Sequence, residues 1–177
     1  MIPWTDFFET ALGEVFFLFL CISPIPFIWQ TVFADTDTTN TKKLCIWLFC
    51  LYIVGLCSFT GITTILYGDF SFYPNLNVAL LGDIFVSPTQ YIFNIVLFMP
   101  FGFLLPLMWK PFHAQNKILW IGFLCSFAIE FLQMFCGRMT DVDDLLTNTV
   151  GAVLGYWLLM FVEQKTICYQ LQQKQCS

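Results

Sequence analysis

The chain has 177 residues, of which 58% are hydrophobic and 11% are charged, and its formal net charge is −5. A soluble chain carries about a quarter of its residues as charged side chains, so this composition indicates an integral membrane protein. The apolar runs are continuous rather than alternating, which favours spanning helices over barrel strands. No basic cluster is present that could hold phosphates, so we expect no nucleic-acid partner.

The first half of the chain predicts two transmembrane helices. Residues 11–33 form the first, which Pro24 and Pro26 are expected to kink. The start of the chain has no basic residue, so it does not have the pattern of a signal peptide. A polar loop at 34–43 precedes a second predicted helix at 44–67.

Residues 68–89 contain several polar residues and prolines. The apolar part of this segment is too short to cross a bilayer, so it is predicted to lie at the interface or to re-enter the membrane. A third helix is predicted at 90–109 and a tight loop at 110–117.

The second half predicts two further transmembrane helices, at 118–136 and 145–162, joined by a charged turn at 137–144. A polar, Gln-rich tail follows. The whole chain, 1–177, is therefore predicted to be a single all-α domain, a polytopic membrane bundle of about five helices.

The positive charges predict the orientation of this bundle. With five spans, six lysines lie in segments on one side and Arg138 lies on the other. Because cytoplasmic loops carry the excess of positive charge, the C-terminus is predicted inside and the N-terminus outside. The lysines are Lys42, Lys43, Lys110, Lys117, Lys165 and Lys174.

Residues 126–155 hold an unusual density of polar groups between two apolar helices. The spacing of Ser126, Glu130 and Gln133 places these residues on one helix face. Asp144 and Asn148 share a face of the next helix in the same way. A short turn makes the two helices antiparallel neighbours, so we expect an outward-facing polar pocket, with Asn94 and Arg138 as candidate partners.

Structural interpretations of the same residues are also open. Glu130 could pair with Arg138 and hold two helices together, while the acidic residues Asp141, Asp143 and Asp144 could cap the last helix. Gly151 and Gly155 are typical of close helix packing. The carboxylates could also bind Ca²⁺ or Mg²⁺, but the turn lacks the length of a Ca²⁺ loop, so no metal is expected.

The eight cysteines form no Cys-x-x-Cys pair, and the chain has one histidine. We therefore expect no cofactor and no histidine-based catalytic site. The cysteines are interpreted as small buried hydrophobic residues.

The order and spacing of four motifs resemble those of the VanZ-like family. The motifs are Asn94 before Met99-Pro100-Phe101-Gly102, then Ser126-x-x-x-Glu130-x-x-Gln133, then Arg138-x-x-Asp141-x-x-Asp144, and last Asn148-x-x-Gly151-x-x-x-Gly155. The resemblance implies a multi-pass protein of the bacterial plasma membrane with a role in resistance to teicoplanin and related lipoglycopeptides. The family positions carried over are Asn94, Pro100, Gly102, Glu130, Gln133, Arg138, Asp141, Asp144, Asn148 and Gly151.

Three functions follow as hypotheses. In the first, the polar pocket binds membrane lipids, a lipid-linked cell-wall precursor or the glycopeptide antibiotic. The predicted binding residues are Asn94, Glu130, Gln133, Arg138, Asp141, Asp144 and Asn148. In the second, Glu130 and Asp144 act as general acid and base of an intramembrane enzyme. In the third, which is weaker because few charges are buried, the chain is a transporter or channel. The sequence does not indicate an oligomeric state.

Overall fold

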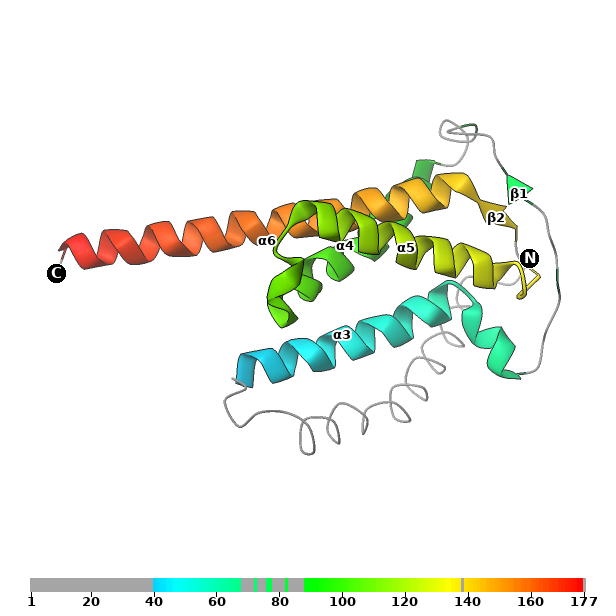
Figure 1. Cartoon of the computed structure of the whole chain (residues 1–177), viewed down its shortest axis with the longest axis horizontal. Coiled ribbons are helices and arrows are strands. Elements are labelled where there is room, and N and C mark those ends of the chain that lie inside the picture. The colour runs from blue at the N-terminus through cyan, green and yellow to red at the C-terminus, as the bar shows by residue number, and fades with distance from the viewer. Residues whose placement is uncertain are drawn as a thin grey trace.

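The computed structural model describes residues 40–67, 72, 76–77, 82, 88–137 and 139–176. In this part of the chain, four α-helices run alternately in opposite directions, α3 (Asn40–Phe59), α4 (Pro88–Met108), α5 (Gln115–Gln133) and α6 (Val142–Cys176) (Figure 1). Two short 3-10 helices, η1 (Ile62–Tyr67) and η2 (Lys110–Phe112), extend the turns. The predicted helical bundle is therefore confirmed.

Three of the described helices are long and apolar enough to cross a membrane, over Lys42–Phe59, Pro88–Met108 and Val142–Thr166. Helix α5 is not among them, because polar residues occupy both its ends and Glu130 lies within it. The first predicted helix, 11–33, lies outside the described residues. The number of five spans and the orientation of the termini therefore remain predictions.

Two helices have ends that differ from those of the predicted spans. The second helix was expected at 44–67, but α3 begins at Asn40 and ends at Phe59, where Gly61 adopts a left-handed φ of 73° before η1. Glycine adopts this conformation without steric penalty, so the chain turns here despite its apolar sequence. At the other end, the polar tail is helical, and α6 runs from Val142 to Cys176, so the helix continues beyond the span predicted at 145–162.

Glycines allow α4 and α6 to pack with their backbones in contact. A Cβ atom added at Gly151 would overlap the carbonyl oxygen of Ile95, and one added at Gly155 would overlap that of Met99. On the facing helix, a Cβ at Gly102 would overlap the carbonyl oxygen of Ala152. The sequence interpretation of Gly151 and Gly155 as packing residues is confirmed within one chain.

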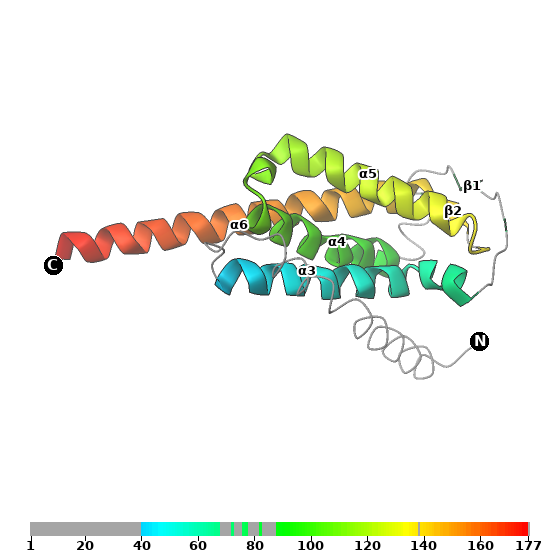
Figure 2. The same ribbon diagram turned by 60° about the horizontal axis from the view of Figure 1, so that its bottom comes forward.

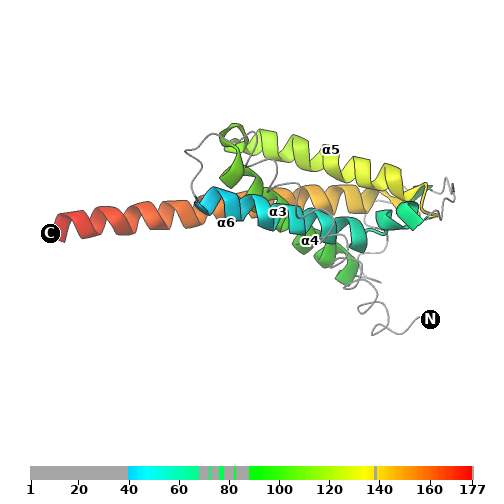
Figure 3. The ribbon, with the colours of Figure 1, turned by 90° about the horizontal axis from the view of Figure 1, so that it is seen from below.

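Around this contact lies the apolar core, which includes Phe98, Phe101 and Ile118. Helix α3 packs on α4, where the Tyr52 hydroxyl donates to the Leu97 carbonyl at 2.9 Å. Views from two other directions show α6 lying between α4 and α5 (Figures 2 and 3). Its C-terminal turns extend beyond the ends of the other helices (Figure 2).

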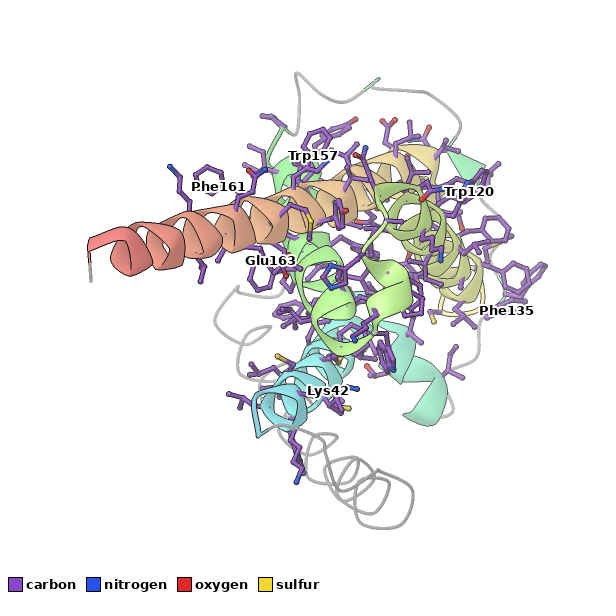
Figure 4. All side chains as sticks on the ribbon, turned by 60° about the vertical axis from the view of Figure 1, so that its left-hand side comes forward. Lys42, Trp120, Phe135, Trp157, Phe161 and Glu163 are labelled. Atoms are coloured by element: carbon purple, nitrogen blue, oxygen red, sulfur yellow. The ribbon has the colours of Figure 1, made fainter. Side chains whose placement is uncertain are left out.

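Large aromatic side chains project from the outside of the bundle. Trp120, Trp157 and Phe161 point away from the helices that carry them (Figure 4), and each exposes half or more of its surface. Trp157 also donates to Gln115 at 3.1 Å, and Lys165 lies over the Phe161 ring. Exposed tryptophan side chains, and lysines close to them along a helix, are typical of a membrane–water interface.

Candidate polar binding pocket

A small polar cavity lies at the end of the bundle where α3 and α5 end and α4 and α6 begin, on the right in Figure 1. Its volume is about 110 Å³. All four described helices or their adjoining turns contribute to it. The lining residues are Phe59, Thr60, Asn94, Leu97, Ile129, Glu130, Gln133, Asp144 and Asn148.

Two turns and a short strand pair shape this end of the bundle. Gly61 after α3 and Gly137 after α5 both have left-handed φ angles, of 73° and 69°. The strand β1 (Leu76–Asn77) pairs in parallel with β2 (Thr140–Asp141), the residues that lead into α6. The predicted charged turn is thus held in place beside the cavity by a segment more than 60 positions earlier in the sequence.

Asp144 joins α6 to α4. Its Oδ1 accepts a hydrogen bond from Asn94 Nδ2 at 2.6 Å and a second from Gln90 Nε2 at 3.2 Å. Gln90 and Asn94 are one helical turn apart, so their side chains reach the same point from one face of α4. Asp144 Oδ2 accepts no hydrogen bond from the residues that the structure describes.

Glu130 is 4% exposed and lies against the start of α6. Its Oε2 accepts the backbone N–H of Asp141 at 3.0 Å, while its own carbonyl accepts the Thr140 hydroxyl at 3.2 Å. The first N–H groups of a helix have no partner within the helix and carry partial positive charge. The Glu130 carboxylate is thus stabilised by the beginning of the neighbouring helix.

Asp141 and Asp143 have structural roles at the same place. Asp141 Oδ1 accepts the Asp143 N–H at 2.9 Å, the geometry of a helix N-cap, and its Oδ2 accepts Asn77 Nδ2 at 3.2 Å. Asp143 is buried and accepts the Tyr91 hydroxyl at 2.7 Å. The capping interpretation is confirmed for Asp141, and neither residue is among those that line the cavity.

The predicted polar faces of α5 and α6 meet. Asn148 Nδ2 donates to the Ser126 hydroxyl at 2.9 Å, and both residues are buried. Gln133 Nε2 donates to the Thr60 carbonyl at 2.9 Å, which ties α5 to the turn after α3. Asn148 Oδ1 is buried and accepts no hydrogen bond in the described part of the chain. Such an unsatisfied group costs about 1–3 kcal/mol.

The cavity is acidic. Its ionisable lining residues are Glu130 and Asp144, with no lysine or arginine among the described residues that line it. Arg138 lies outside the described residues, so its predicted pairing with Glu130 remains a prediction. Within the described ranges, no group of three or more His, Cys, Asp and Glu side chains has the arrangement of a metal site.

The structure therefore brings five of the seven predicted binding residues together, Asn94, Glu130, Gln133, Asp144 and Asn148. Their role in binding remains a prediction. Sequence reasoning missed Gln90, although its position four residues before Asn94 was a usable signal. It also missed the Thr60 carbonyl, and a backbone acceptor leaves no signal in a sequence.

Comparisons with known proteins assign the chain to a family. The sequence profile of VanZ-LLP1 (VanZ/LLP1) matches residues 14–163. Protein VanZ of Enterococcus faecium is 37% identical over 67 residues, which are 37% of this chain and 41% of that protein. The alignment thus spans less than half the length of that relative. No solved structure matches the chain.

Proposed function

Because the chain belongs to the VanZ/LLP1 family, we propose that it is a multi-pass protein of the bacterial plasma membrane that protects cells against teicoplanin-type glycopeptides. The relative named Protein VanZ supports this role, as do three helices of membrane-spanning length. In this proposal the polar cavity is the working site. It engages an envelope lipid, a lipid-linked cell-wall precursor or the drug itself.

The observation that carries this proposal is the convergence of the family motifs on one cavity. Asn94 comes from α4, Glu130 from α5 and Asp144 from α6, yet all three line the same space of about 110 Å³. Packing alone does not require one buried and one half-buried carboxylate between apolar helices, because ionisable groups at membrane depth are expensive to bury. Their position together in one cavity favours a ligand that interacts with them.

A second candidate function is an intramembrane enzyme that modifies a lipid-linked envelope molecule. The presence of two carboxylates, Glu130 and Asp144, in one cavity favours it, since they could act as general acid and base. Binding is the stronger proposal, because Glu130 is already held by the Asp141 N–H and Asp144 by Asn94. Mass spectrometry of envelope lipids from cells with and without the protein separates the two functions, since only an enzyme leaves a modified lipid.

The test of the proposed function is teicoplanin susceptibility in cells that produce wild type, Glu130→Gln or Asp144→Asn. Both substitutions keep an oxygen that can accept the native hydrogen bond, so we expect the fold to be preserved. Glu163→Gln, near the far end of the α6 span (Figure 4), is the matched control. We expect wild type and the control to protect and both pocket variants to fail at equal membrane abundance. Wild-type protein that gives no protection would rule out the proposed role.

A further inference from the structure

The cavity offers hydrogen-bond acceptors without partners. Its amide nitrogens each donate one hydrogen bond to a protein oxygen, Asn94 to Asp144, Gln133 to Thr60 and Asn148 to Ser126. Two acceptors in the lining residues receive no donor from the described residues, Asn148 Oδ1 and Asp144 Oδ2. A ligand that satisfies these two acceptors must bring N–H or O–H groups.

The buried carbonyl oxygen of Asn148 is a second observation, independent of the acidic residues, that points to a ligand. It is 4% exposed, and its nitrogen is engaged by Ser126, which does not line the cavity. The carbonyl oxygen is therefore the polar atom of Asn148 that is left for the cavity.

From these contacts we infer that the cavity binds a primary ammonium group, an inference that rests on the proposed function and specifies its ligand. Glu130 and Asp144 supply negative charge, and an ammonium supplies three donors in a compact head. An anionic phosphate would be repelled by the same carboxylates. A quaternary ammonium has no N–H and is recognised by aromatic cages, whereas Phe59 is the sole aromatic residue in the described lining.

The size of the cavity sets how much of the ligand enters it. One water needs about 10–15 Å³ of such space, so about 110 Å³ admits a group of several atoms but no whole lipid or antibiotic. The ammonium and the carbons beside it would lie inside, with the remainder of the molecule outside. Two sources share this chemistry, the ethanolamine head of an envelope lipid and a free amine of the glycopeptide.

The experiment uses the full chain purified in a zwitterionic detergent, with the thermal unfolding midpoint as readout. Ethylammonium chloride is titrated against tetramethylammonium chloride at the same ionic strength. We expect a saturable rise of the midpoint with ethylammonium alone, because a ligand that binds the native state stabilises it by mass action. The Asp144→Asn variant is expected to bind ethylammonium about 10- to 100-fold more weakly, the effect of losing one charge-assisted hydrogen bond.

Asn148→Ala should also weaken binding, while Asn116→Ala, at an exposed position on α5, serves as its control. Phosphatidylethanolamine compared with its N-acetyl form, and an amine-bearing glycopeptide compared with its N-acetylated form, then distinguish the two sources. The source whose stabilising effect is lost on acetylation is the ligand.

Equal midpoints with both ammonium salts would overturn the inference, as would unchanged ethylammonium binding by Asp144→Asn. A response that emerges only in Arg138→Gln protein would also overturn it, by showing that the chain supplies its own cation. These failures are separable from failure of the proposed function. If pocket variants abolish drug protection but ethylammonium has no effect, the inference is wrong and the proposed function is supported. If ethylammonium binds but the protein gives no drug protection, the proposed function is wrong and the inference is supported.

Discussion

Replacing Gly151 by Ala is predicted to loosen the α4–α6 contact that places the pocket residues. An added Cβ would overlap the Ile95 carbonyl oxygen, which belongs to a rigid helix backbone and cannot rotate away. Overpacking of this kind costs about 1–3 kcal/mol, and the better helix propensity of Ala offsets about 0.5–1 kcal/mol of it. We therefore expect a net loss of about 0–2.5 kcal/mol in the free energy of unfolding.

The matched control for this prediction is Gly55→Ala in α3. A Cβ at Gly55 meets no atom within 4 Å, so the variant should be as stable as wild type or more stable by about 0.5–1 kcal/mol. Reversible unfolding in mixed detergent micelles measures both variants. The reasoning fails if Gly151→Ala is as stable as Gly55→Ala.

Three further substitutions test individual hydrogen bonds by the same unfolding measurement. Tyr91→Phe removes a donor to the buried Asp143 carboxylate and should destabilise the protein by about 1.5–3 kcal/mol. Tyr52→Phe removes a bond to the neutral Leu97 carbonyl and should cost about 0.5–1.5 kcal/mol, so an equal or larger loss than in Tyr91→Phe would contradict the ranking. Both Asp141→Ala and Asp141→Asn lose the hydrogen bond from Asn77, but only Asp141→Ala also removes the N-cap of α6, so it should cost about 1 kcal/mol more than Asp141→Asn; similar losses in both would argue against capping.

The helical periodicity of the sequence was sufficient to predict which polar faces meet. Residues at spacings of three and four lie on one side of a helix, so Ser126, Glu130 and Gln133 all turned out to be buried. The short turn made α5 and α6 neighbours, and the hydrogen bond from Asn148 to Ser126 follows from that arrangement.

The boundaries of α3 and α6 could not be predicted in the same way. Residues 59–67 stay mostly apolar across the break, so hydropathy gives no stop signal, and the left-handed conformation of Gly61 is what ends the straight helix. Helix α6 continues beyond its apolar part because Gln and Lys, although polar, are good helix formers, as is Leu. Hydropathy locates the part of a helix that suits a membrane, not the end of the helix.

The most direct test of the central claim exchanges the two residues that face each other across α4 and α6. Asn94 donates to Asp144 at 2.6 Å, so the double variant Asn94→Asp with Asp144→Asn keeps one carboxylate and one amide at this contact. Teicoplanin susceptibility is measured for each single variant and for the double variant at equal membrane abundance. The pocket account predicts that both single variants lose protection and that the double variant regains it. Single variants that protect as well as wild type would contradict the account.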